Sequence, residues 1–224
     1  MLALKSTEDS EVKNAAATTL AFFAAILLFL SSCATTNDRI TDGRYFSPLN
    51  NFSVPIPAGL GLRVQEEAST EGGGVAFHDD LGNFKSISYL RQPPEALKAQ
   101  MDRIQQRAIL VGFLNDFAMP NLFKPVSPDA NILYREHINV GDDNAYFAIV
   151  EIPGGSTMFD VRANKRHDTK RGLLIFFKEK FIYMLSSGEN PSVLELGQPP
   201  KPLDKLVEYE KESLLSFRSK ITFK

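Results

Sequence analysis

The chain has 224 residues, of which 43% are hydrophobic and 23% are charged, a composition typical of a globular protein with one hydrophobic core. The formal net charge of −2 gives no indication of nucleic-acid binding. The single cysteine excludes an intramolecular disulfide framework and a metal site built from several cysteines.

An uncharged hydrophobic stretch of eleven residues runs from Leu20 to Leu30, shortly before the only cysteine, Cys33. It is short for a membrane span, which takes about 20 apolar residues, but it suits the hydrophobic region of a secretory signal peptide. The four residues that follow its core, Leu30-Ser31-Ser32-Cys33, resemble the lipobox of bacterial lipoproteins. In that family the cysteine thiol accepts a diacylglyceryl group as a thioether, acyl chains such as palmitate anchor the protein, and the signal peptidase cleaves before the cysteine.

We therefore expect residues 1–32 to be a lipoprotein signal peptide and Cys33 to be the lipidated first residue of the mature chain. Two alternatives are an ordinary cleaved leader with an incidental cysteine, and a short membrane anchor. Residues 1–12 contain three acidic residues and one lysine, which suits a signal peptide badly, whereas Lys13 directly follows Val12. We accordingly expect translation to start at Val12.

The lipobox resemblance implies a bacterial cell-envelope protein that is bound to a membrane through Cys33 and faces the periplasm. Ala34 follows the cysteine. In Gram-negative bacteria an Asp at this position retains lipoproteins at the inner membrane, so Ala34 favours the outer membrane. Residues 33–45 are predicted to be the lipidated N-terminus and a short polar tether of about 20 Å reach. The folded part, residues 46–224, is then expected to work close to a membrane surface.

Several local patterns predict strands in the first part of the folded region. Alternating Phe52, Val54 and Ile56 predict a strand, and the neighbouring prolines favour an edge position for it. Residues 62–68 predict a second, exposed strand. Residues 72–90 predict a hairpin that turns over residues 79–83.

A helix is predicted next, because Pro93-Pro94-Glu95 is typical of a first helical turn and apolar residues then recur at three- and four-residue steps. We expect it to end near Asp116, before a loop interrupted by prolines. The remaining expected elements are a hairpin with strands at 132–140 and 145–152, a nearly all-apolar hairpin at 172–187 in the buried centre of a sheet, and a closing amphipathic helix over 203–221.

These elements predict an α+β fold: a mainly antiparallel sheet built from hairpins, with helices packed on its faces. The motifs follow one another in a fixed order over residues 52–223. They are the opening F-x-V-x-I-P strand, the GGGVAFHDD…NFKSISYL hairpin with the helix after it, the two later hairpins and the closing helix. In this order they resemble the PsbP-like α/β/α sandwich, found in PsbP of photosystem II, a nuclear Ran-binding protein and several bacterial envelope lipoproteins. The resemblance implies a single domain over 46–224 that serves as a non-enzymatic accessory or adaptor module.

Few residues suggest catalysis or a bound metal. The histidines His78, His137 and His167 lack metalloprotease spacing, and no nucleophile-elbow motif is present. We therefore expect no catalytic residue, no cofactor and no enzymatic activity. His78, Asp79 and Asp80 are weak candidates for a cation site through their oxygens, with Asp142 and Asp143 as a second acidic pair. Since aspartates also favour hairpin turns, we expect turn residues and no metal.

The segment VRANKRHDTKRG, residues 161–172, is the most distinctive surface candidate. It gathers five basic residues: Arg162, Lys165, Arg166, Lys170 and Arg171. The simplest interpretation is a solvated loop. The alternative is contact with anionic lipid headgroups, with lipopolysaccharide phosphates or with an acidic protein partner.

Three functions remain open at this point. The leading hypothesis is an adaptor that binds another envelope protein. The second is a carrier or sensor of a small or lipidic ligand held in the phenylalanine-rich interior. The third is an envelope hydrolase or metal-dependent enzyme. No nucleic-acid partner is expected.

Overall fold

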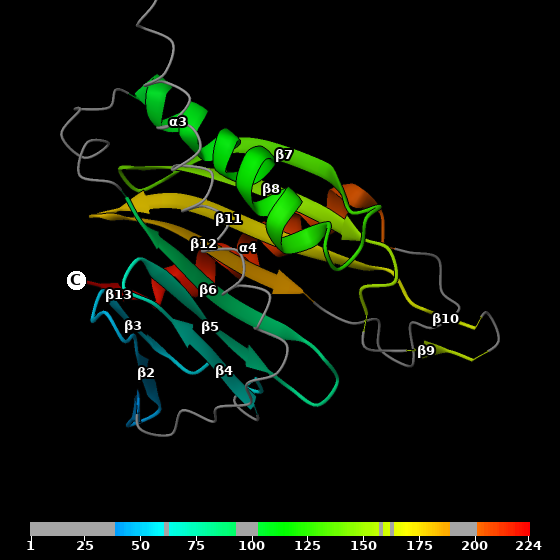
Figure 1. Ribbon diagram of the computed structural model, residues 1–224, viewed down its shortest axis with the longest axis horizontal. Helices are drawn as coiled ribbons and strands as arrows, with labels where there is room; N and C mark the ends of the chain where they lie inside the picture. Colours follow the sequence, from blue (N-terminus) through cyan, green and yellow to red (C-terminus); the bar gives the residue numbers. More distant parts are fainter. Residues whose placement is uncertain (1–38, 61–62, 93–102, 157–158, 162–163, 189–200) are drawn as a thin grey trace, which may run out of the picture. The chain divides into compact units, whose positions relative to one another are not determined.

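The computed structural model describes residues 39–60, 63–92, 103–156, 159–161, 164–188 and 201–224 (Figure 1). The chain divides into two compact units, residues 1–34 and 35–224, and all described residues belong to the second. The predicted signal peptide and Cys33 therefore lie outside the described residues.

The larger sheet contains seven strands, all antiparallel, in the order β4-β5-β6-β12-β11-β8-β7 (Figure 1). These strands are β4 (Arg63–Ala68), β5 (Gly72–His78), β6 (Phe84–Arg91), β7 (Asn131–Val140), β8 (Asp143–Ile152), β11 (Thr169–Lys178) and β12 (Phe181–Gly188). The three predicted hairpins are present as β5–β6, β7–β8 and β11–β12. The predicted α+β fold with a mainly antiparallel sheet is confirmed.

The hairpin formed by β11 and β12 lies in the middle of this sheet, as its apolar sequence predicted. β12 pairs with β6, and β11 pairs with β8, so this hairpin joins the early strands to the β7–β8 hairpin. All of β12 is buried, and so is β11 from Gly172 to Phe176. Both strands are apolar nearly throughout because each is covered on both faces.

A smaller sheet has the order β1-β2-β3-β13. Its strands are β1 (Ile40–Thr41), β2 (Arg44–Phe46), β3 (Phe52–Pro55) and β13 (Thr222–Phe223). β3 has a neighbour on each side, so the expected edge position is wrong. Pro55 is tolerated there because β13 pairs only with Phe52 and Ser53, and Pro55 lies beyond its reach.

Strands β1 and β2 occupy residues that were expected to belong to the polar tether. Tyr45 of β2 is fully buried in the core, and its hydroxyl donates a hydrogen bond of 2.6 Å to Glu66 Oε2. Residues 40–45, which were expected to belong to the tether, are therefore part of the folded domain. Strands of two and three residues are too short to show an alternating pattern, which is why the sequence did not predict them.

One face of the large sheet is covered by α3 (Arg103–Gly112) and the π-helix η3 (Phe113–Phe123), which follows it without a break (Figure 1). The expected end near Asp116 is therefore wrong, and Pro120 lies inside the helical segment. Leu114, Ala118 and Phe123 are buried against the sheet, and this burial favours helix beyond Asp116. The predicted start of this helix lies outside the described residues.

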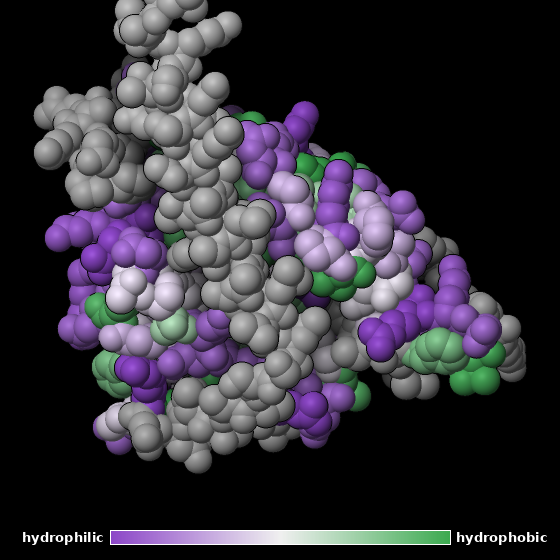
Figure 2. Space-filling model, in the orientation of Figure 1, coloured by the Kyte–Doolittle hydropathy of each residue, from purple (hydrophilic) through white to green (hydrophobic). Residues whose placement is uncertain are grey.

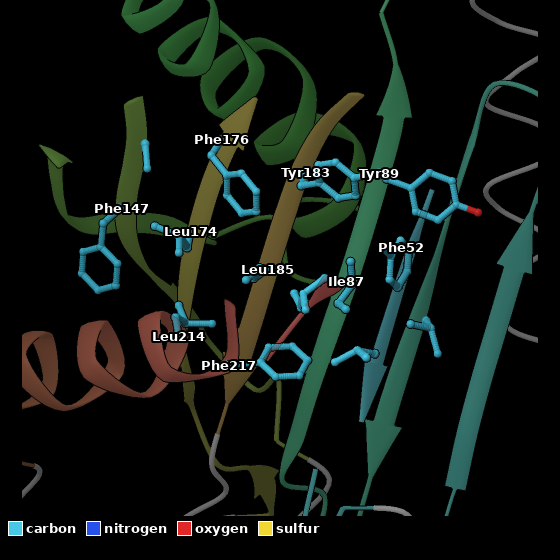
Figure 3. Packing of buried hydrophobic residues seen from close by; sticks show 14 of the residues in the cluster. Phe52, Ile87, Tyr89, Phe147, Leu174, Phe176, Tyr183, Leu185, Leu214 and Phe217 are labelled. Atoms are coloured by element: carbon cyan, nitrogen blue, oxygen red, sulfur yellow. The ribbon is translucent and has the colours of Figure 1, made fainter. Parts of the chain in front are cut away.

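The opposite face is covered by α4 (Leu203–Ser219) and by the smaller sheet, which completes an α/β/α arrangement. Leu214 and Phe217 of α4 lie against the side chains of the central strands (Figure 3). A last pair of short strands, β9 (Phe159–Asp160) and β10 (Lys165–Arg166), forms a separate two-stranded hairpin (Figure 1). In the sequence it comes after β8 and before β11.

Candidate functional site

The segment of five basic residues, for which a solvated loop and a contact surface were the two interpretations, does not place its described members in one cluster. Lys165 and Arg166 form β10, and both side chains are exposed. Lys170 and Arg171 belong to β11 of the large sheet. Arg162 lies outside the described residues. Only Lys165 and Arg166 are therefore brought together as a basic pair on the small hairpin.

The β9–β10 hairpin also carries two exposed apolar side chains that sequence reasoning missed. Phe159 is 53% exposed and Val161 is 83% exposed. Phe159 is the cross-strand partner of Arg166, so its ring and the guanidinium lie on the same face of the hairpin. Figure 2 shows a hydrophobic patch beside strongly hydrophilic side chains where β9 and β10 lie. The available signal was the pair of apolar residues directly before the basic run.

Two hydrogen bonds join the segments that lead into and out of this hairpin, next to the ends of β8 and β11. The backbone N–H of Ser156 donates to the carbonyl of His167 at 3.0 Å, and the N–H of Gly154 donates to Asp168 Oδ1 at 2.9 Å. Gly154 has a φ of +66°, which favours glycine. A Cβ at Gly155 would lie 2.6 Å from a methyl carbon of Ile152. The segment Gly154-Gly155-Ser156 is thus a turn with defined contacts.

Lys170 and Arg171 point to opposite faces of the large sheet, as successive strand residues do. Lys170 pairs with Glu151, its cross-strand partner on β8, at 4.0 Å. Arg171 lies on the α3 side, with its guanidinium carbon 4.7 Å from the centroid of the Phe84 ring. These two basic residues therefore belong to different environments, and neither joins the hairpin surface.

Arg171 is the end of a row of side chains that crosses four strands. Gly188 of β12 is the cross-strand partner of both Arg171 and Phe84, and a Cβ there would lie 2.5 Å from a carbon of the Phe84 ring. The missing side chain lets Arg171 and Phe84 meet across β12. The ring of His78 stacks on Phe84 with centroids 5.8 Å apart and 28° between planes. We call His78, Phe84 and Arg171 the cationic row.

Two buried polar atoms of this row lack a hydrogen-bond partner among the described residues. The pKa of Arg171 is lowered to about 10 because burial disfavours its charge, so it remains cationic at neutral pH. The pKa of His78 is lowered by burial first, and then by the nearby charges of Arg171 and Arg63, so its ring is neutral near pH 7. Within the described part of the chain, His78 Nε2 and Arg171 Nε are buried without a hydrogen-bond partner.

The weak metal candidates next to His78 are engaged in a turn. Asp79 Oδ1 accepts hydrogen bonds from the N–H groups of Leu81 and Asn83, at 2.9 and 2.8 Å. Asp80 pairs with Arg63 at 3.4 Å on the surface. Among the described residues, no three His, Cys, Asp or Glu side chains are grouped to hold a metal ion.

The phenylalanine-rich interior, in which the second hypothesis placed a ligand, contains packed aromatic rings. Phe52 makes edge contacts with Tyr89 and Tyr183, with centroids 5.6 and 6.1 Å apart, and Phe176 stacks on Tyr183 at 5.6 Å. Figure 3 shows these four rings beside one another in the core. A surface pocket of about 450 Å³ lies instead along α4, between Asp204 and Ser216.

None of the helices in the described ranges combines the length and the apolar character that crossing a membrane requires. No protein-family model matches the chain. No curated protein matches it either.

Solved structures do show a likeness. The chain resembles cyanobacterial PsbP in fold. That structure, CyanoP from Synechocystis sp. PCC 6803, is 11% identical, with 87% of this chain and 99% of that chain covered and a TM-score of 0.39. A crystal structure from Bacteroides thetaiotaomicron VPI-5482 is 10% identical, with 83% of this chain covered and a TM-score of 0.37. This chain spans about half of that protein, 49% of its length.

Proposed function

We propose that this protein is a membrane-anchored bacterial lipoprotein that acts as a non-enzymatic adaptor and binds another envelope protein through the β9–β10 hairpin. The observation that carries the proposal is the exposure of Phe159 and Val161 beside the exposed Lys165 and Arg166. Aromatic residues and arginine are enriched at the centres of protein interfaces. The partner surface is accordingly expected to be acidic, with an apolar depression for Phe159.

The energetics of the hairpin support this role. Full burial of a phenylalanine or valine side chain is worth about 1.5–3 kcal/mol, and Phe159 and Val161 retain more than half of their surface for contact. The tied base of the hairpin reduces the conformational entropy that binding would cost. Isolated apolar residues are common on surfaces, but here the two lie within three residues on a projecting element.

The membrane anchor in this proposal is Cys33, supported by the lipobox resemblance of residues 30–33. Because β1 begins at Ile40, only six residues separate Cys33 from the first strand that the structure describes. A chain of this length spans no more than about 25 Å from Cys33 to Ile40. An adaptor so close to its anchor would meet partners at the membrane surface, on the periplasmic side of the outer membrane.

The test is photo-crosslinking in intact cells. A photo-reactive residue replaces Lys165 on the hairpin or, as a matched control, Lys180, an exposed lysine in the turn at the opposite end of β11. We expect a discrete protein adduct from position 165 that is absent from position 180 and is lost when Phe159→Ser and Arg166→Glu are added. Adducts to lipid alone, or equal adducts from both positions, would overturn the proposal.

A further inference from the structure

We propose that the cationic row formed by His78, Phe84 and Arg171 is a binding site for a phosphate group, with Arg171 as its anchoring cation. This site lies on the large sheet rather than on the β9–β10 hairpin, and it does not depend on the proposed adaptor function.

The first step of the argument is the state of Arg171. Its side chain is half-buried on the sheet, and within the described ranges it makes neither an ion pair nor a hydrogen bond through Nε. A cation removed from water without a partner is costly, and buried charges are normally paired. Its guanidinium carbon lies 4.7 Å from the centroid of the Phe84 ring, a cation–π contact that holds the guanidinium in place without neutralising its charge.

The second step is the charge that the row offers. Arg171 and His78 lie on either side of Phe84, and Arg63 on β4 is the cross-strand partner of His78. Arg63 is engaged with Asp80 at 3.4 Å. The unpartnered Nε2 of His78 can donate a hydrogen bond or, once protonated, add a second positive charge beside Arg171.

The third step is the choice of ligand. A guanidinium presents several N–H donors in a planar fork that matches a phosphate group. A phosphomonoester carries nearly two negative charges at neutral pH, so it gains more from the cationic Arg171 than a carboxylate does. The cross-strand pair Ser86 and Ser186 comes next on the same face of β6 and β12 and supplies two hydroxyl groups near the row. A phosphate group is therefore the ligand that this chemistry fits.

The test uses the purified full-length chain in detergent, titrated with inorganic phosphate, with the short-chain lipid dihexanoyl phosphatidic acid, and with acetate. Two signals are followed: the NMR resonance of the Arg171 Nε–H, identified by its loss in Arg171→Met, and the melting temperature. We expect phosphate or the lipid to shift the resonance and to raise Tm by roughly 3–6 °C at ten times Kd. A response to phosphate assigns a soluble phosphorylated ligand, and a response to the lipid alone assigns a lipid headgroup.

The variants separate binding from structure. Arg171→Met keeps the apolar stem and should lose the Tm response, and Arg171→Lys should bind about tenfold more weakly because it lacks the fork. The matched control is Arg91→Met, since Arg91 also lies over a phenylalanine ring, Phe181, at 5.7 Å but is exposed. It should respond as the natural chain does.

Three results would overturn the proposal. The first is no response to phosphate or to phosphatidic acid. The second is an equal response to acetate, which would remove the assignment of phosphate. The third is a lower Tm of Arg171→Met without any anion, because that would show that the guanidinium stabilises the fold unaided.

Discussion

At the scale of single residues, Gly172 determines how closely α4 lies against β11. A Cβ at this position would come within 2.8 Å of Glu210 Oε2 and 3.0 Å of the Glu210 Cβ. Glu210 is only 2% exposed, and its carboxylate accepts a hydrogen bond from the hydroxyl of Ser187 on β12. A polar contact therefore joins helix and sheet where the glycine leaves room for it.

We expect Gly172→Ala to lower the free energy of unfolding by about 1–3 kcal/mol, because the added methyl group must displace Glu210 or α4. Urea unfolding measures the change. The control is Gly112→Ala at the end of α3, where the nearest atom to the new Cβ is Asp116 Oδ2 at 3.5 Å. That variant should be neutral or more stable by up to about 1 kcal/mol. Equal losses in the two variants would contradict the close approach at Gly172.

At the scale of elements, Asp143 connects three of them. It lies at the start of β8 and accepts from Lys178 Nζ at the end of β11, at 3.2 Å. It also accepts from the guanidinium of Arg218 in the last turn of α4, a side chain that is 15% exposed and lies over the Phe176 ring. Asp142 and Asp143 were considered as a weak candidate for a metal site, and the carboxylate of Asp143 thus has a structural role.

Asp143→Asn should destabilise the fold by about 1–3 kcal/mol, because Arg218 would lose its carboxylate in a largely buried setting. Thermal unfolding at neutral pH and low salt gives the change. In the comparison variant Glu208→Gln, the broken pair with Lys205 has side chains 72% and 69% exposed. That loss should stay below about 0.5 kcal/mol. A loss in Asp143→Asn no greater than this would show that the connection is not stabilising.

The helical segment shows where element prediction from periodicity fails. The three- and four-residue steps predicted an apolar face that includes Ala108, yet Ala108 is exposed and the buried positions include Leu110, Leu114 and Ala118. Apolar residues surround this helix on several sides, so more than one face fits a 3.6-residue period. The π-helical stretch then changes the number of residues in each turn, which no local pattern indicated.

At the scale of the whole molecule, each hairpin forms between strands that are close in the sequence. The hairpins are then joined by pairing between strands that are far apart in the sequence. β12 pairs with β6 across about a hundred residues of chain, and β13 at the C-terminus pairs with β3 near the start of the folded part. The domain therefore cannot be divided between β3 and β13 without exposing strand edges.

Replacing Cys33 by Ser is expected to release the protein from the membrane fraction, because acyl chains contribute about 0.8 kcal/mol per buried CH₂ and the variant has no thiol to carry them. Ala34→Asp should move the protein from the outer to the inner membrane in a Gram-negative host. Density-gradient fractionation of the membranes measures both changes. Retention of Cys33→Ser in the membrane would favour the alternative of a short N-terminal membrane anchor.

The candidate surfaces were predictable only in part. The basic residues of the hairpin were evident because charged residues adjacent in sequence remain adjacent in a two-stranded hairpin. The cationic row was not evident from the sequence, because His78, Phe84 and Arg171 come from three strands. These side chains meet only through the register in which the strands pair. Gly188, which lets two of them touch, has no local pattern that marks its role.

The sequence by itself determined the three main hairpins, the closing helix, the α+β class and the central place of the most apolar strands. These follow from alternation, turn residues and apolar content, which act between near neighbours. Only the tertiary structure decided the strand order, the two short strands before residue 46, the separation of Lys170 from Arg171 and the pairing of Arg171 with Phe84. Those depend on which distant strands pair and in which register, and a shift of one residue would move every side chain to the other face.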